Sequence, residues 1–286
     1  MLVVHNDYTN SRGVLTLLPP SWEELKQFPT APNNLLDALW QGSYPRIYDR
    51  TIPASRWLSD YVSAYVQRDV RQVTRVTDLN SFTTFLKLCA GQTGQEINYS
   101  KLGNDSGISH NTARSWLSVL ETSWLTLALP AWHRNVRKQV VKAPKLHFLD
   151  SGLVCHLLGI RNAEELRHHP LRGAIFESWV VAELFKQFTN RGEKPALYHY
   201  REARGLEIDI LLEQATHLDL VEVKAGSTVN SHFFKNLLSF QEHWADNKSD
   251  STKLNAWLVY GGNEQYKRQG CWVRGWEHVA DISPTP

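Results

Sequence analysis

The 286-residue chain is poor in cysteine, in net charge and in long apolar runs. Its three cysteines, Cys89, Cys155 and Cys271, lie far apart without paired spacing, which argues against a disulfide framework and a zinc site. No stretch reaches the roughly 18 apolar residues of a membrane span. The first residues also lack the signal-peptide pattern of a basic segment followed by a long apolar run. A net charge of +2 is too small for nucleic-acid binding through bulk charge, so any basic surface must be local. We therefore expect a cytoplasmic protein with no membrane partner.

Two strand patterns late in the chain carry charged residues where burial is expected. Asp209 lies within the apolar run 206–212, and Glu222 and Lys224 alternate with valines in 220–224. Residues two apart on a strand share a face, so Glu222 and Lys224 project together. A hairpin between the two runs would place Asp209 beside them. Carboxylates suit Mg²⁺ or Mn²⁺, and a lysine can hold or activate water, so this grouping predicts a metal-dependent hydrolytic site.

A helix predicted over residues 171–188 adds a third carboxylate. The helical neighbours of Glu177 are glycine, alanine and two valines, so its side chain leaves an apolar face. Burying an unpaired charge costs several kcal/mol, so a cationic partner or a metal is expected beside it. Glu183 has mixed neighbours, and we expect it at the surface. The alternative for the strand pair is that Glu222 and Lys224 form only the solvated face of a half-buried strand.

The stretch 76–150 has the predicted order of a winged helix: three helices followed by strands. Ser109 is placed to cap the third helix, over 110–122, and Arg114 lies near its exposed start. Basic residues gather in the segment that would form the wing, where a hairpin can follow a phosphate backbone: Arg134, Arg137, Lys138, Lys142 and Lys145. The alternative is a spacer or a protein contact, because a helix with a single arginine is a poor reader of bases.

These residues resemble two known groups. The run 205–209, the Glu222–Lys224 strand and the Glu177 helix resemble the PD-(D/E)xK nuclease-like core of restriction endonucleases. Across nearly the whole chain, four short motifs resemble the C-terminal region of a bacterial and archaeal group of AAA-type P-loop ATPases: 42–45, 65–70, 148–153 and 176–179.

The resemblance implies a role for each site residue. Asp209 and Glu222 would be metal ligands, Lys224 would position or activate water, and Glu177 would be a supporting or second-metal ligand. The Val223 carbonyl is an expected further ligand, since hard cations often take carbonyl oxygens. Arg201 and Arg204 precede the Asp209 strand and would face a phosphate or be solvated.

The chain departs from the ATPase group at its start. It has no glycine-rich loop ending in Gly-Lys-Ser/Thr, so we expect no ATP binding. Segment 13–25 resembles the last strand and exit of an ATPase domain, and apolar residues there would invite self-association if exposed: Leu15, Leu17, Leu18 and Trp22. The predicted division is a truncated ATPase remnant (1–45), a connecting helix (46–75), a winged-helix module (76–150), linker helices (151–172) and a nuclease-like domain (173–286).

We therefore expect a mixed α/β protein, a winged helix followed by a PD-(D/E)xK-like α/β domain. The leading functional hypothesis is a metal-dependent, nuclease-like protein that associates with nucleic acid. The alternative is a non-catalytic interaction module or a partner of an ATPase. A transcription regulator is disfavoured by the few basic residues on the helix over 110–122.

Overall fold

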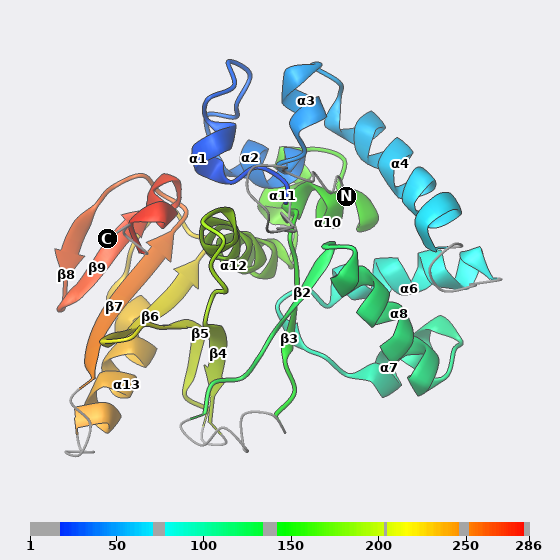
Figure 1. Cartoon of the computed structure of the whole chain (residues 1–286). Coiled ribbons are helices and arrows are strands. Elements are labelled where there is room, and N and C mark those ends of the chain that lie inside the picture. The colour runs from blue at the N-terminus through cyan, green and yellow to red at the C-terminus, as the bar shows by residue number, and fades with distance from the viewer. Residues whose placement is uncertain (1–17, 71–77, 134–141, 203–204, 246–251, 283–286) are drawn as a thin grey trace, which may run out of the picture.

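The computed structural model describes residues 18–70, 78–133, 142–202, 205–245 and 252–282. Helices and a small sheet occupy the N-terminal half, and a larger mixed sheet occupies the C-terminal part (Figure 1). The predicted mixed α/β class is confirmed.

Short helices open the described chain. Ser21 and Glu24 form the capping box that the sequence contains, with the Ser21 N–H donating to the Glu24 carboxylate at 2.8 Å. Within the predicted connecting segment 46–75, residues 54–70 form a helix whose last six residues widen into a π-helical turn. The elements are α1 (Trp22–Leu25), α2 (Leu35–Gln41), α3 (Pro45–Asp49), α4 (Ala54–Ala64) and η1 (Tyr65–Val70).

Three helices and a small antiparallel sheet follow. Asn98 and Ser109 cap the second and third helices through their side chains, and Gly107 supplies the left-handed turn between them at φ 69°. The sheet order is β1-β3-β2. The elements are α6 (Leu79–Gly91), β1 (Gln95–Glu96), α7 (Tyr99–Ser106), α8 (His110–Thr122), β2 (Thr126–Leu129) and β3 (Lys145–Phe148).

The segment that follows β2 joins this small sheet to the large one. The Trp132 N–H donates to the His199 carbonyl at 2.6 Å, and the His199 N–H donates to the Pro130 carbonyl at 2.9 Å. Ala131 thereby forms a parallel bridge with His199, on the free edge of the large sheet. The first residues of the β2–β3 connection therefore run along the outer edge of β4.

The large sheet has the order β4-β5-β6-β7-β9-β8. Strands β4, β5 and β6 pair antiparallel, β7 lies parallel to β6 and to β9, and β8 is antiparallel to β9. The elements of this part are α10 (Ser151–Leu157), α11 (Ala163–His168), α12 (Arg172–Asn190), β4 (Leu197–Arg201), β5 (Glu207–Glu213), β6 (His217–Lys224), η2 (Ser231–Phe234), α13 (Lys235–Ala245), β7 (Lys253–Tyr260), β8 (Tyr266–Arg268), β9 (Cys271–Gly275) and η3 (Trp276–Ile282).

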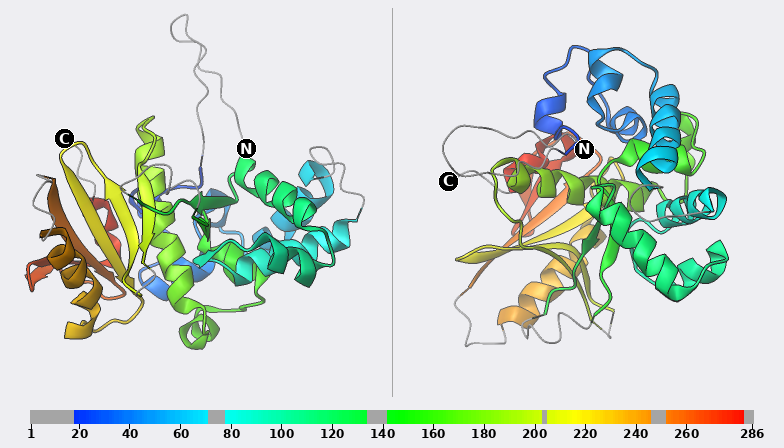
Figure 2. Two further views of the ribbon diagram at one scale, coloured as in Figure 1. Left: turned by 90° about the horizontal axis from the view of Figure 1, so that it is seen from below. Right: turned by 45° about the vertical axis from the view of Figure 1, so that its right-hand side comes forward.

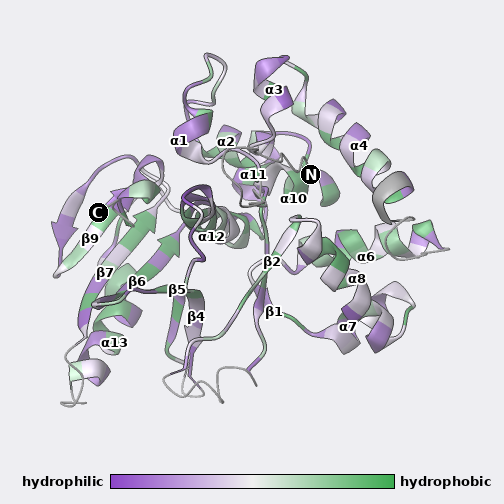
Figure 3. Ribbon diagram, in the orientation of Figure 1, coloured by the Kyte–Doolittle hydropathy of each residue, from purple (hydrophilic) through white to green (hydrophobic). Residues whose placement is uncertain are grey.

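Alternation along β6 sends apolar side chains to both faces of the sheet. Val221 and Val223 join the cluster that contains α12, whereas Leu220 joins the cluster that contains Leu237 and Phe240 of α13. The two helices thus cover opposite faces (Figure 2). Hydrophobic residues are prominent on β6 and β7 between them (Figure 3).

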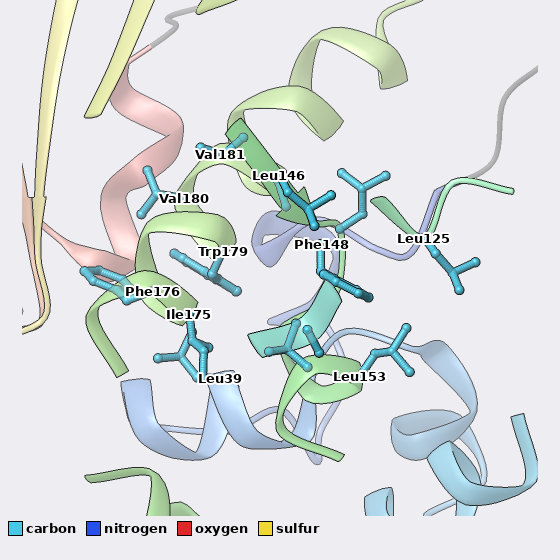
Figure 4. Packing of buried hydrophobic residues seen from close by; sticks show 14 of the residues in the cluster. Leu39, Leu125, Leu146, Phe148, Leu153, Ile175, Phe176, Trp179, Val180 and Val181 are labelled. Carbon is cyan, nitrogen blue, oxygen red and sulfur yellow. The ribbon is translucent and has the colours of Figure 1, made fainter. Parts of the chain in front are cut away.

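One apolar core runs from the N-terminal helices into the large sheet. Leu39 of α2, Phe148 of β3, Leu153 of α10 and Trp179 of α12 pack in the same cluster (Figure 4). Trp22 belongs to it as well, with its ring centroid 4.5 Å from that of Trp276. The expectation that Trp22 forms exposed apolar surface is therefore wrong, because this side chain is buried beside η3. Leu18 is partly buried, and Leu15 and Leu17 lie outside the described residues.

Candidate acidic site

The β5–β6 hairpin brings Asp209 beside Glu222 and Lys224. Ile210 pairs with Val221, and the Val223 N–H donates to Asp209 Oδ2 at 2.8 Å. Lys224 Nζ lies 2.6 Å from Glu222 Oε2 and 3.6 Å from Asp209 Oδ2. One ammonium group therefore faces two carboxylates from neighbouring strands.

A shift in the pairing register between β4 and β5 sets the direction of the Asp209 side chain. Tyr198 pairs with Leu211 but Tyr200 pairs with Ile208, so β5 holds one more residue than β4 between these two pairs. Ile208 and Leu211, three positions apart, consequently join the same apolar cluster. Such bulges bend a strand and redirect a side chain, and they are frequent beside active sites. The plain alternation used to interpret the sequence fails at this point.

Glu177 has a cationic partner that the sequence did not reveal. Lys145 Nζ, from β3, lies 3.0 Å from Glu177 Oε1 and 2.8 Å from Glu207 Oε1. Its side chain is only 5 % exposed. The expectation that Lys145 follows a phosphate backbone is wrong, because its ammonium is buried between two glutamates.

The site holds more carboxylates than ammonium groups. Four acids face two bases: Glu177, Glu207, Asp209 and Glu222 against Lys145 and Lys224. Burial, followed by the charge of Asp209, raises the pKa of Glu177 and of Glu222 to about 8. Burial alone would lower the pKa of each lysine, but the carboxylates outweigh it and raise both pKa values. Two negative charges remain uncompensated when all four acids ionise.

The chemistry of the donors suits a hard divalent cation, but the ligand set is small. Across the described ranges, no three acidic, histidine or cysteine side chains stand close enough together to hold a metal ion. Asp209 and Glu222 supply oxygen donors of the kind Mg²⁺ and Mn²⁺ prefer, and one such ion would balance the excess charge. Asn236 of α13 fixes the second oxygen of Glu222, donating to Oε1 at 3.2 Å. Glu177 is directed toward Lys145 instead.

Helix α12 holds a second buried ion pair at Glu183. Glu183 is 1 % exposed, and its Oε1 lies 2.9 Å from Lys186 Nζ. Its other oxygen accepts the Trp22 N–H at 2.5 Å, and Lys186 also donates to the Pro20 carbonyl and to Ser43 Oγ. The expectation that Glu183 lies at the surface is therefore wrong, because the N-terminal segment covers it. Only the order Glu183-x-x-Lys186 hinted at this pair.

Two of the residues expected to contact nucleic acid lie in the described part of the chain, on different elements. Arg114 is exposed on α8, with its guanidinium 5.6 Å from the centroid of the Tyr99 ring. Arg201 is exposed and lies 3.3 Å from Glu96 Oε1. Arg137, Lys138 and Arg204 lie outside the described residues, as does Arg134.

Two family models match the chain, and both are domains of unknown function. The first, DUF8612, matches residues 32–164, and the second, DUF4143, matches residues 172–278. The acidic site draws Lys145 from the first range and its carboxylates from the second. Within the described part of the chain, no helix is long and apolar enough to cross a membrane.

The chain is also similar to two uncharacterized mycobacterial proteins. These are Rv2008c of Mycobacterium tuberculosis and Mb2031c of Mycobacterium bovis, each 25 % identical over 195 residues. The match covers 67 % of this chain and 43 % of each relative. The chain thus spans less than half the length of these curated relatives, and their names assign no activity.

Proposed function

We propose that this chain is a metal-dependent, nuclease-like protein that acts on nucleic acid. The observation that carries the proposal is the convergence of Asp209 and Glu222 on one lysine, at a bulged strand in a site where carboxyl groups outnumber ammonium groups. Carboxylates that are crowded and short of counter-charge are a common signature of cation-binding and catalytic sites.

The proposal assigns a role to each residue. Asp209 and Glu222 would hold Mg²⁺ or Mn²⁺, with the Val223 carbonyl as a further ligand, and the ion would supply charge stabilisation at a phosphate. Lys224 would position or activate the attacking water. Lys145 would keep Glu177 in place beside the ligands, so Glu177 acts as a supporting group.

The N-terminal module gives the proposal weaker support. The helices α6, α7 and α8 with the β1-β3-β2 sheet have the element order of a winged helix, and Arg114 on α8 is exposed. We propose that this module contacts the phosphate backbone, with Arg137, Lys138, Arg201 and Arg204 as further candidates.

The test compares wild type with Asp209→Asn and with Glu213→Gln, which removes an exposed acid from the same strand. We expect calorimetry to show Mn²⁺ binding by wild type and Glu213→Gln, and at least tenfold weaker binding by Asp209→Asn. Cleavage of plasmid and single-stranded DNA should fall about a hundredfold or more in Asp209→Asn alone. Equal inertness of all three proteins, with no Mn²⁺ uptake, would contradict the proposal.

A second candidate is a non-catalytic interaction module that partners an ATPase. Its favouring observation is that Lys224 already pairs with both Asp209 and Glu222, as an inactive site would require. The second matching family is commonly associated with AAA-type ATPases, which fits such a partner. This candidate predicts no Mn²⁺ uptake and no ATP binding by this chain, with Asp209→Asn affecting only stability.

A further inference from the structure

A pocket of about 250 Å³ lies outside the acidic site, where the β2–β3 connection, the end of β4 and α13 meet. Aromatic side chains form its walls: Trp132, Tyr200, Phe240 and Trp244. Their rings contact one another in sequence, with centroids 6.0 Å apart for Trp132 and Tyr200 and 4.9 Å apart for Tyr200 and Phe240. Trp132 and Phe240 are buried, while Tyr200 and Trp244 remain half-buried. The walls are thus flat, apolar and partly open to solvent.

Polar groups stand among these rings. Lys142 and His243 are exposed, and Glu202 accepts a hydrogen bond from the Tyr200 hydroxyl. The Lys142 ammonium donates to the Arg201 carbonyl at 3.0 Å, which keeps it beside the pocket. The lining therefore combines stacking surfaces with a cation, a carboxylate and an imidazole.

The pocket adjoins the acidic site through the pairing of β4 with β5 and through helix α13. Tyr200 pairs with Ile208, the residue that precedes Asp209. On α13, Asn236 binds Glu222, and Phe240 and Trp244 follow at four-residue intervals on the same side of the helix. Eight residues of helix rise about 12 Å. A chain of a few nucleotides is long enough to reach both places.

We propose that this pocket takes an unstacked nucleobase of a single-stranded nucleic acid, which is then the substrate class of the acidic site. Aromatic side chains bind every base through its flat face, and a nearby lysine complements the backbone phosphate. A duplex keeps its bases stacked and cannot offer one to the pocket without unpairing it. An apolar side chain of a partner protein would make no polar contact with the charged groups that line the pocket. The proposal rests on the function proposed above and adds the form of its substrate.

The test uses the full chain in EDTA, so that binding is separated from cleavage. The probe is an oligothymidylate of about 15 nucleotides, compared with a duplex of equal length. Trp244→Leu removes a half-buried wall of the pocket. Trp272→Leu is the matched control, because Trp272 is 38 % exposed on β9, away from the pocket. We expect Trp244→Leu to bind the oligonucleotide about tenfold more weakly, and Trp272→Leu to bind it as wild type does.

A second variant keeps the test valid if Trp244→Leu folds poorly. Lys142→Gln changes an exposed side chain, and we expect it to bind severalfold more weakly, with a salt dependence reduced by about one counterion. Wild-type preference for the duplex, or unchanged binding by both pocket variants, would overturn the proposal. Asp209→Asn alters the acidic site and is measured for cleavage, whereas the pocket variants are measured for binding in EDTA, where no metal ion is present. Loss of cleavage therefore tests the acidic site, while loss of EDTA-resistant binding tests the pocket.

Discussion

Helix α12 carries two glutamates, Glu177 and Glu183, that meet lysines in very different surroundings. Glu183 and Lys186 are almost fully buried, and each finds further hydrogen-bond partners in the N-terminal segment. Glu177 and Lys145 lie in a group where acids outnumber bases. The comparison teaches that the part of α12 around Glu183 is electrostatically closed, with a structural role, and that the part around Glu177 is open to an additional cation.

The largest predicted effect is at the closed part of α12. Replacing Lys186 by methionine would leave Glu183 charged and unpaired in the core. We expect Lys186→Met to lower the free energy of unfolding by about 3–5 kcal/mol. Chemical denaturation measures the loss of unfolding free energy. The control is the exposed pair Arg161–Glu165, where Arg161→Gln should lower the free energy of unfolding by less than about 1 kcal/mol. If Lys186→Met lowered the free energy of unfolding as little as Arg161→Gln, the surroundings of Glu183 would not be electrostatically closed.

The second prediction concerns pH near the open part of α12. Burial, and then the charge of Lys145, lowers the pKa of His199 to about 4, from an ordinary value of 6.5. As the pH falls below 6.5, the unfolded chain takes up the proton before the folded chain does. The contribution of neutral His199 to the free energy of unfolding is therefore fully present above about pH 6.5. It is lost toward pH 4, by up to about 3 kcal/mol.

The matching variant is His199→Gln, which retains a side-chain donor for the Ala143 carbonyl. The difference in unfolding free energy between wild type and this variant should shrink as the pH falls from 6.5 to 4. Taking the difference separates His199 from Glu177 and Glu222, whose raised pKa values act in the opposite direction. Parallel pH profiles for the two proteins would show that His199 is not held neutral by burial.

The smallest predicted effect is the loss of Lys145. Lys145→Met leaves Glu177 and Glu207 without their cation, but these acids are 15 % and 33 % exposed and can take up protons. We expect a loss of about 2 kcal/mol in EDTA, below that of Lys186→Met. Removing a positive charge should also strengthen Mn²⁺ binding, so Mn²⁺ should restore more stability to Lys145→Met than it adds to wild type. If Lys145→Met lost as much free energy of unfolding as Lys186→Met, the surroundings of Glu177 would be as closed as those of Glu183.

The sequence predicted most of the local structure near the site. Strand patterns in 206–212 and 220–224 form β5 and β6, and the hairpin between them places Asp209 beside Lys224. The helix expected over 171–188 is α12, which extends two residues further. These features follow from periodicity over a few neighbouring residues, which a single sequence contains.

The parts that the sequence did not predict all depend on contacts between distant segments. Glu183 has ordinary helical neighbours, and only the packing of residues 20–22 buries it, 161 positions away in the case of Trp22. Lys145 lies in a basic stretch, yet its partners are on α12 and β5. The bulge at Asp209 changes the strand register without any glycine or proline to mark it. The pocket likewise draws its walls from three separate elements.

The bridge between Ala131 and His199 also covers part of an outer strand of the large sheet. An unpaired outer strand offers free backbone groups to another chain. Here the segment 130–132 occupies part of the β4 edge, while the opposite edge strand, β8, spans three residues and carries Lys267 and Arg268. Short, charged or covered edges are how natural sheets resist fibril growth. A change that detaches residues 130–132 would thus expose a site for strand addition.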